Sequence, residues 1–287
     1  MPAGSTDRLI LAVDARRQTL IDVIRRARRE ITLSLFRCND EAILEELAAA
    51  TARGVDVDVL VTSRSKGSPQ RRQKLWEALD RTGATLYQYS DPVVKYHAKY
   101  LVADDGPAVV ASLNFTRKCF SRTCDAMVVT SDPQVVSGLR RLMAADRDRQ
   151  PVPAELPPRL IIGPERARSQ LTSLIEQART SIRILDAKLS DPDLIALLRS
   201  KRTAGVNVEI VSAKRVAGLK SHGKLMIVDD KLLVVGSIAL SAMSLDFRRE
   251  VSVVVEDPAA VAEAAQLFAS IDADRPEPPA AGDTAIL

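Results

Sequence analysis

The chain has 287 residues, 46% of them hydrophobic, with 41 basic and 37 acidic side chains and a formal net charge of +4. This composition predicts a globular protein with a sizeable core. The small positive charge is compatible with a phosphate-bearing partner and excludes a dedicated nucleic-acid coat protein.

The apolar runs and the cysteines indicate in which cellular compartment the protein is found. The longest apolar runs fall short of the roughly 20 residues that a membrane-spanning helix needs, so a lipid substrate would be met at a membrane surface. Three unevenly spaced cysteines do not make a disulfide framework, and the first residues lack a signal-peptide pattern. We therefore expect a cytoplasmic protein.

The first predicted elements occur twice. Residues 31–61 align without a gap with residues 182–212, at a constant offset of 151. Each segment begins with a β-branched strand, passes through an aspartate cap (Asp40 or Asp191) into an amphipathic helix, and ends, after a glycine, with an alternating strand. Because the residues before each segment also predict a helix, the chain contains an internal repeat.

Farther along the chain the offset changes to 125, again without gaps. The change leaves 26 additional residues in the first copy, where residues 64–92 predict a helix and a strand. One wall of any cleft shared by the two copies should therefore be asymmetric. The equivalent pairs at this offset are His97 and His222, Asp104 and Asp229, Ser112 and Ser237, and Asp125 and Glu250.

The repeat predicts how the chain is organised. We expect a first repeat at residues 1–148, a proline-rich linker at 149–159, a second repeat at 160–273 and a disordered tail at 274–287. Strands that alternate with helices predict an α/β fold in which each repeat has a mixed sheet flanked by helices. The two repeats would pack as a monomer with an internal pseudo-twofold axis, with the site at their junction.

Both histidines of the chain, His97 and His222, begin an H-x-K-x-x-x-x-D segment. Strand alternation would place His97 and Lys99 on one face. A lysine neutralises a phosphodiester oxygen, a neutral imidazole can attack phosphorus, and an imidazolium can protonate the leaving oxygen. Two copies of the segment therefore supply all three functions in one pocket.

Each histidine also needs an acceptor that fixes its second ring nitrogen. Asp125 and Glu250, each 28 residues after a histidine, are the candidates. Ser112, Asn114 and Ser237 follow the next strand of each copy and offer donors that suit phosphate oxygens.

The duplicated pattern resembles the phospholipase D superfamily, whose signature is H-x-K-x(4)-D followed by G-S-x-N. The resemblance covers roughly residues 9–148 and 160–273, and the chain departs from the signature at Ala111 and Ala239. It implies duplicated phospholipase D-like units and a two-step, metal-independent phosphodiester exchange through a phosphohistidine, without a cofactor. The candidate catalytic residues are His97, Lys99, Asp104, Asp125, His222, Lys224, Asp229 and Glu250.

The resemblance also implies roles for these residues. By analogy His97 is the nucleophile and His222 the general acid and base. The acidic partners are expected to cross between the repeats, pairing Glu250 with His97 and Asp125 with His222. Asp104 and Asp229, although part of the signature, are expected to fix the turn after the strand.

The motif predicts the bond that is broken but leaves the substrate open. Our first hypothesis is a phosphoric diester hydrolase acting on a phospholipid headgroup, and the main alternative is a metal-independent endonuclease with nucleic acid as its partner. A phosphatidyltransferase resembling cardiolipin synthase and an inactive binding protein are further alternatives. Only ten of the 287 residues are aromatic, which argues against strong interfacial anchoring of a lipid enzyme.

Two other groups of residues have structural and functional interpretations. Cys119 and Cys124 are expected to be ordinary thiols rather than metal ligands, because further histidine or cysteine ligands are lacking nearby. Basic residues flank both motifs. They could form the rim of an anion-binding cleft or belong to solvated loops, and the phosphate chemistry favours the rim. These residues are Lys95, Arg117, Lys118, Arg122, Lys214, Arg215, Lys220, Arg248 and Arg249.

Overall fold

The first half of the protein is built on a mixed sheet with the strand order β1-β9-β7-β6-β2-β3-β4. The computed structural model describes residues 6–62, 69–216 and 218–273. The strands of this sheet are β1 (Asp7–Ile10), β2 (Glu30–Leu35), β3 (Asp56–Thr62), β4 (Thr85–Tyr89), β6 (Tyr100–Ala103), β7 (Ala108–Ala111) and β9 (Met127–Thr130). The helices of this half are α1 (Val13–Arg26), α2 (Glu41–Ala52), α3 (Pro69–Asp80), α4 (Arg117–Ser121) and α5 (Pro133–Asp148).

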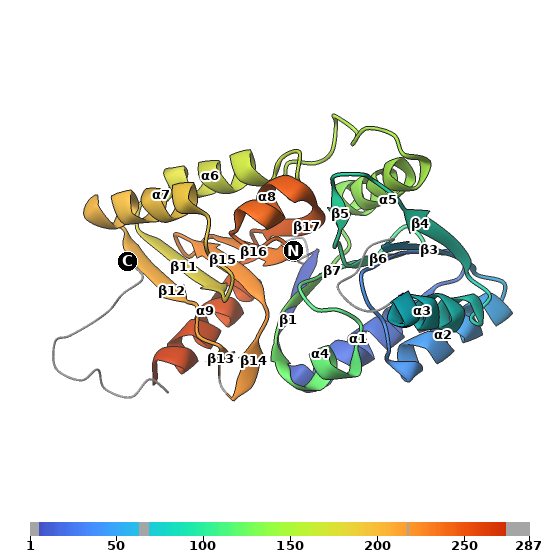
Figure 1. Cartoon of the computed structure of the whole chain (residues 1–287). Coiled ribbons are helices and arrows are strands. Elements are labelled where there is room, and N and C mark those ends of the chain that lie inside the picture. Colours follow the sequence, from blue (N-terminus) through green and yellow to red (C-terminus); the bar gives the residue numbers. More distant parts are fainter. Residues whose placement is uncertain (1–5, 63–68, 217, 274–287) are drawn as a thin grey trace.

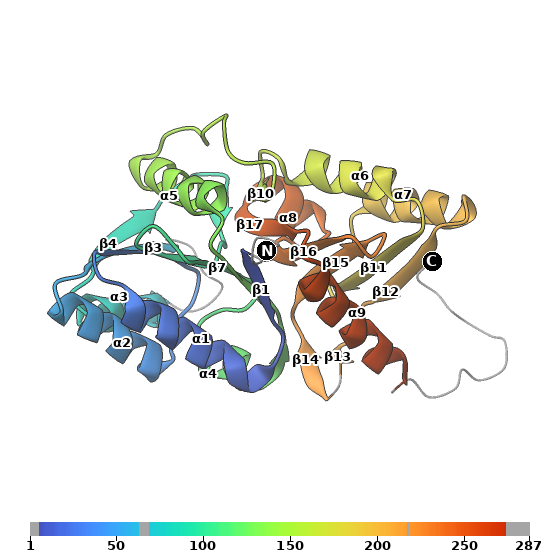
Figure 2. The same ribbon diagram turned by 180° about the vertical axis from the view of Figure 1, so that it is seen from behind.

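The second half repeats this arrangement with the strand order β10-β17-β16-β15-β11-β12. Its strands are β10 (Leu160–Gly163), β11 (Ser181–Asp186), β12 (Asn207–Val211), β15 (Lys224–Val228), β16 (Leu232–Gly236) and β17 (Arg248–Val255). Its helices are α6 (Ala167–Gln177), α7 (Pro192–Thr203), α8 (Ala242–Phe247) and α9 (Pro258–Ala273). The two halves lie side by side, with helices on both faces of each sheet (Figures 1 and 2).

The predicted α/β fold with two similar units is confirmed, and the units differ where the sequence predicts. The additional segment of the first half supplies α3 and β4, and β4 extends the first sheet at its edge by pairing with β3. The second half has instead a small antiparallel pair, β13 (Arg215–Val216) and β14 (Leu219–Ser221). Residue 63, residues 64–68 of the additional segment and the predicted disordered tail at 274–287 lie outside the described residues.

The helix boundaries follow from the residues that the repeat predicts there. Asp40 and Asp191 are the N-caps of α2 and α7, and the Asp191 side chain accepts a bond from the Leu194 amide at 3.1 Å. Gly54 and Gly205 follow these helices with φ angles of +82° and +89°, a region that side chains rarely adopt. Both copies therefore have an aspartate at the N-cap position and a glycine stop, but the Asp40 carboxylate accepts from the Arg17 guanidinium at 3.0 Å and not from a helix amide.

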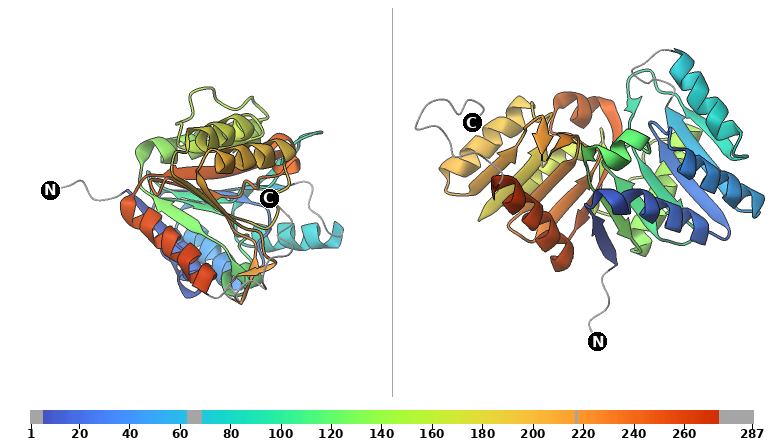
Figure 3. Two further views of the ribbon diagram at one scale, coloured as in Figure 1. Left: turned by 90° about the vertical axis from the view of Figure 1, so that its left-hand side faces the viewer. Right: turned by 90° about the horizontal axis from the view of Figure 1, so that it is seen from below.

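The two sheets share an inner core. One cluster of buried side chains combines Val110 of the first sheet and Leu139 of α5 with Val251 of the second sheet and Phe268 of α9. Separate clusters lie between the first sheet and α1 and α2, and between the second sheet and α6 and α7. Helix α9 runs alongside β1 at the boundary between the halves (Figure 3), so the halves bury one continuous apolar surface.

Two parallel strand pairings, each only two residues long, join the halves at equivalent positions. Strand β5 (Lys95–Tyr96) pairs in parallel with the first residues of β17, and β8 (Thr123–Cys124) pairs in parallel with β14. These two strand pairs, the seams, exchange under the offset of 125, as expected of an isologous interface. The sequence periodicity did not predict them, because a two-residue strand carries no periodic signal.

The remaining segments can be placed briefly. Residues 149–159 run between α5 and β10 without helix or strand, and Leu156 of this segment is buried. Within the described residues, none of the helices combines the length and apolarity needed to span a bilayer. Cys38, Cys119 and Cys124 are buried free thiols.

Candidate active site

His97 lies at the first seam. Its amide donates to the Arg249 carbonyl at 2.9 Å, between β5 and β6. The prediction that His97 and Lys99 are part of a strand is wrong, because the chain leaves the first sheet here to pair with β17 and β6 begins at Tyr100. The two side chains nevertheless lie together, with the Lys99 Nζ 3.0 Å from the His97 Nδ1.

His222 occupies the equivalent position at the second seam. Its amide donates to the Cys124 carbonyl at 3.3 Å, and Lys224 begins β15. The ammonium of Lys224 donates to the His222 carbonyl, as the ammonium of Lys99 does to the His97 carbonyl. Both lysines are almost completely buried, so each ammonium is held in place by its own motif.

The carboxylates pair with the histidines across the two halves. The His97 Nδ1 lies 2.8 Å from Oε1 of Glu250, and the His222 Nδ1 lies 2.8 Å from Oδ1 of Asp125. This is the crossed arrangement that the family resemblance led us to expect. Because each pair joins opposite halves, the two motifs meet at one junction, and the Nε2 atoms are left for chemistry.

Asp125 is held by a network of hydroxyl groups. Its Oδ1 accepts from the Ser112 hydroxyl at 2.7 Å and its Oδ2 from the Thr123 hydroxyl at 2.6 Å. Burial raises the pKa of Asp125, but His222, Lys224 and Thr123 outweigh it and hold this pKa below its ordinary value. Asp125 is therefore a firmly ionised partner for His222.

Glu250 has a different environment although it is the equivalent residue. It is completely buried, and burial raises its pKa above the ordinary value against the opposing effect of Lys99 and Arg248. The Arg248 Nη1 lies 3.6 Å from Oε1 of Glu250. The equivalent serine, Ser237, donates to the Val251 carbonyl at 3.3 Å, so it does not repeat the contact that Ser112 makes with Asp125.

These environments act differently on the two imidazoles. Burial, reinforced by Lys99, lowers the pKa of His97 well below its ordinary value. Burial also lowers the pKa of His222, but the charge and hydrogen bond of Asp125 oppose this effect. His97 is therefore held neutral, whereas His222 keeps a partner that stabilises its protonated form.

Four cations lower the pKa of His97 by their charge: Lys99, Lys188, Lys224 and Arg248. Sequence analysis did not single out Lys188. Lys188 follows β11, and burial together with Lys224 and Arg248 lowers its pKa. The same Lys188 and Lys224 lower the pKa of Lys99. The signal that could have identified Lys188 is its repeat equivalent, Arg37, which is also cationic and follows β2. Ammonium groups that disfavour one another's charge are stabilised together when an anion binds among them.

The three predicted phosphate-binding residues differ in whether their polar side-chain atoms already have a hydrogen-bond partner. Ser112 and Ser237 are buried, with hydroxyls engaged by Asp125 and by the Val251 backbone. The Asn114 side chain is nearly buried, and its Oδ1 lacks a hydrogen-bond partner among the described residues. Phosphate binding by these three residues stays a prediction, and the contacts of Ser112 show it positioning Asp125.

Asp104 and Asp229 lie at the far ends of their strands from the histidines. The Asp104 carboxylate accepts from the amides of Arg28, Arg29 and Glu30 at 2.8–3.2 Å. Asp229 accepts in the same way from the amides of residues 179–181 at 2.7–3.0 Å. Both have positive φ angles. Their place in the candidate catalytic set is therefore corrected: they fix the turn, as expected from their position.

Two further expectations concern the metal ligands and the basic rim. Ligand atoms of Cys119, Asp125 and His222 lie within 4.8 Å of one another, close enough to hold a metal ion. An ion there would compete with the bonds that Asp125 makes to its hydroxyl partners and to His222. Among the rim residues, Arg249 is buried and bonded to Asp146 and Glu165, so its assignment to the rim is wrong.

Two α/β units with crossed histidine–carboxylate pairs at their junction define a duplicated phospholipase D-type protein. The family model described as "Cardiolipin synthase, PLD-like domain" matches residues 20–147 and 211–271. The chain belongs to this family and to the phospholipase D superfamily.

Individual proteins show how far the similarity extends. Cardiolipin synthase 1 of Bacillus anthracis is 27% identical over 128 residues, which are 44% of this chain and 25% of that protein. The polyphosphate kinase of Porphyromonas gingivalis has a TM-score of 0.75 at 22% identity, over 93% of this chain and 48% of that one. The phosphatidylserine synthase of Haemophilus influenzae has a TM-score of 0.71 at 13% identity, over 94% and 87%. At these identities the solved structures show the fold alone.

Proposed function

We propose that the protein exchanges the headgroup phosphodiester of a phospholipid through a covalent phosphohistidine on His97. The observation that carries the proposal is the pair of crossed contacts, His97 with Glu250 and His222 with Asp125. They leave two Nε2 atoms at the junction, one on a neutral ring and one on a ring with an ionised partner. The surrounding lysines would neutralise the phosphate oxygens.

In the first step the Nε2 lone pair of His97 attacks phosphorus. The bond between phosphorus and the leaving alcohol oxygen breaks, and His222 gives its Nε2 proton to that oxygen. Glu250, whose Oε1 lies 2.8 Å from the His97 Nδ1, would stabilise the positive charge that forms on the ring. The products of this step are the free alcohol, the phosphohistidine and a neutral His222.

In the second step the neutral His222 takes a proton from an acceptor alcohol or from water. The acceptor oxygen attacks phosphorus, the bond between phosphorus and nitrogen breaks, and His97 is restored. Asp125 stabilises the imidazolium that His222 becomes. All proton transfers use side chains of this chain, so we expect turnover in the presence of EDTA.

The acceptor decides between hydrolysis and synthesis. Hydrolysis was the first hypothesis from the sequence, but the relative from Bacillus anthracis is named a synthase, and so is the structural neighbour from Haemophilus influenzae. These names support transfer to an alcohol as the second step. We therefore propose phosphatidyl transfer, with hydrolysis as its side reaction when water is the acceptor.

The test is a turnover assay of the purified protein with EDTA. Vesicles of phosphatidylglycerol, vesicles of phosphatidylcholine with added glycerol, and plasmid DNA are incubated in parallel, and lipid products are separated by chromatography. We expect a transphosphatidylated lipid in excess of phosphatidic acid, abolished in His97→Ala and retained in the exposed control Lys231→Ala. Nicking of DNA without lipid turnover would establish the endonuclease alternative, and turnover of neither substrate would refute the proposal.

A further inference from the structure

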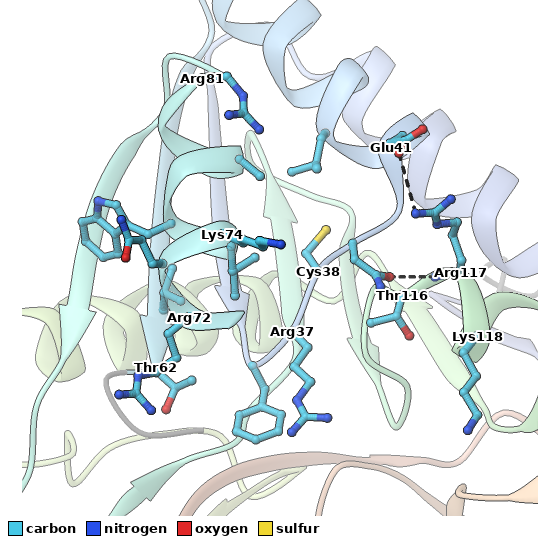
Figure 4. A pocket seen from close by; sticks show the side chains of 18 of the residues that line it. Arg37, Cys38, Glu41, Thr62, Arg72, Lys74, Arg81, Thr116, Arg117 and Lys118 are labelled. Atoms are coloured by element: carbon cyan, nitrogen blue, oxygen red, sulfur yellow. Dashed lines mark hydrogen bonds and ion pairs between the residues drawn. The ribbon is translucent and has the colours of Figure 1, made fainter. Parts of the chain in front are cut away.

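A cavity of about 860 Å³ opens over the first half of the molecule (Figure 4). Its wall is formed by the segment after β2, by the ends of β3 and β4, and by helices α2, α3 and α4. Strands β2, β3 and β4 are parallel, and ligands of α/β proteins bind at the carboxyl ends of such strands. Its volume lies within the usual range of about 300–1,000 Å³ for small-molecule sites. We call it the α3 pocket.

The α3 pocket belongs to one half only. Helix α3 and strand β4 come from the additional segment, which the second half lacks. The pocket also touches the reactive centre, because Phe36 is part of its lining and the Phe36 ring centroid lies 4.4 Å from that of His97. A molecule in the pocket would therefore approach the phosphorus from the side of the first half.

The lining is strongly cationic. Six basic side chains line the pocket against a single acidic one, Glu41, which lies 3.7 Å from the Arg117 guanidinium. Arg72, Lys74 and Arg81 on or beside α3 have no ion-pair partner in the described parts of the chain. Figure 4 shows Lys74 and Arg81 directed toward the interior of the cavity. The full set of basic residues is Arg37, Arg72, Lys74, Arg81, Arg117 and Lys118.

Apolar side chains complete the lining. Val61, Leu75 and Trp76 are part of the lining, and 37% of Trp76 is exposed, which is high for a large apolar side chain. A lining with both cationic and apolar side chains suits a compact molecule that has both an anionic group and an apolar part. The pocket is partly open to solvent, but its lining is confined to one end of the first sheet, whereas a polymer needs a groove that follows several phosphates.

We propose that the α3 pocket binds the acceptor alcohol of the transfer reaction and selects acceptors that carry a phosphate of their own. This inference rests on the proposed function. The acceptor phosphate would lie between Lys74 and Arg81, while its hydroxyl reaches the phosphohistidine past Phe36. Both possible sources of the acceptor, a soluble metabolite and a lipid headgroup, would present the same group, a phosphorylated alcohol.

Binding is measured first, on the His97→Ala protein, so that the result does not depend on turnover. Titration calorimetry with glycerol 3-phosphate should detect a complex that glycerol does not form. A Lys74→Ala/Arg81→Ala double variant should weaken it about tenfold or more, since hydrogen bonds to charged groups are lost. Lys74→Arg should keep most of the affinity, and the distant exposed pair Arg26→Ala/Lys231→Ala is the matched control.

Transfer is then measured from phosphatidylcholine to glycerol, to glycerol 3-phosphate and to phosphatidylglycerol. The double variant should raise KM for the phosphorylated acceptors about tenfold with glycerol transfer changed less than twofold. A preference for phosphatidylglycerol over glycerol 3-phosphate identifies the lipid headgroup as the source, and the reverse identifies a soluble phosphate.

The outcomes separate the two proposals. If the protein turns over no phospholipid but its binding of glycerol 3-phosphate depends on Lys74 and Arg81, the proposed function is refuted while the anion site stands. If phospholipid is turned over but the double variant binds and transfers to every acceptor as the parent does, the α3 pocket proposal is refuted. Loss of single-stranded DNA binding in the double variant, with glycerol 3-phosphate binding unchanged, would also refute it.

Discussion

The two halves of the protein have the same strand order and the same histidine–lysine motif, yet they provide different surroundings for equivalent groups. The carboxylate of Asp125 is bonded to two hydroxyl groups, whereas the equivalent Glu250 is completely buried among cations. As a result His222 has the more strongly ionised partner. The comparison teaches that a duplicated site can divide two catalytic roles between identical side chains by changing only their neighbours.

The second difference lies outside the repeat itself. The additional segment gives the first half α3, β4 and the α3 pocket, whereas the second half has the small antiparallel β13–β14 pair at that place. In the proposed reaction the pseudo-symmetric core would bind the reacting phosphate, and the asymmetric segment would select the acceptor that approaches it. The predictions below concern substitutions in one half of the protein, and the equivalent residue of the other half is the reference where it is tested.

The largest expected difference is between the two histidines. His97→Ala should lower kcat by about 10⁴-fold or more, because the nucleophile is lost. His222→Ala should lower it by about 10²–10⁴-fold with an alcohol leaving group. A substrate that leaves as p-nitrophenolate needs no proton, so the rate of its first step should be largely kept in His222→Ala.

Burst kinetics with a p-nitrophenyl phosphodiester measure this difference. A burst that survives in His222→Ala and is absent in His97→Ala agrees with the assigned roles. The opposite pattern would reverse the two roles, and the exposed Lys231→Ala variant controls for general effects on folding.

The acidic partners should give the next largest effects. Asp125→Asn and Glu250→Gln should each lower kcat by about 10²–10⁴-fold, the range for general acid–base catalysis. They should differ in pH dependence, because Asp125 raises the pKa of His222 and its removal lowers that pKa. The alkaline limb of the rate profile, where His222 loses its proton, should therefore move to lower pH in Asp125→Asn. Equal profiles for the two variants would contradict the different roles.

The seams should differ in their dependence on charge. Arg249 is buried at the first seam and bonded to Asp146 at 2.8 Å, and the equivalent residue at the second seam is Cys124. Arg249→Ala should destabilise the protein by about 3–5 kcal/mol because an unpaired buried charge is left behind. Cys124→Ala should cost far less.

Chemical denaturation followed by circular dichroism measures both free energies of unfolding. The double variant Arg249→Met/Asp146→Leu should recover much of the stability, since apolar side chains can replace a buried ion pair. A double variant as unstable as Arg249→Ala would show that the seam depends on something other than this pair.

The signature aspartates should give the smallest effects. Asp229→Ala should cost about 0.5–2 kcal/mol of stability, as for the loss of a capping side chain, with kcat unchanged. Folding lowers the pKa of Asp229 from 3.8 to about 2, so its contribution is present above pH 3.8 and disappears as the pH falls toward 2. Thermal unfolding across this range checks the sign. If kcat of the folded Asp229→Ala variant falls, Asp229 contributes to catalysis and the prediction is wrong.

Much of this organisation could be predicted from the sequence, because it repeats. The capped helices, the glycines that end them and the additional helix and strand follow from local patterns at constant offset. The crossed carboxylates were accessible only through the family resemblance, since Asp125 and His222 are 97 positions apart in the chain.

What could not be predicted depends on contacts between distant segments. The two-residue seams have no periodic signal, and the burial of Arg249 depends on Asp146, which lies 103 positions away. The α3 pocket combines residues of six elements or their flanking segments, so neither its shape nor its charge can be read from any one of them. Lys188 could be predicted in part. The repeat predicts a cation at this position, but it does not predict how far that cation lies from the histidines.

The most direct test is to trap and locate the covalent intermediate. Phospholipid labelled with ³²P in the headgroup phosphate is mixed with the protein, the reaction is quenched in alkali, where phosphohistidine survives, and the labelled peptide is sequenced. Label on the peptide that contains His97, and none on it in His97→Ala, is the expected result. Label on the peptide that contains His222 would contradict the division of roles between the halves, and failure to label either peptide under turnover would contradict the phosphohistidine itself.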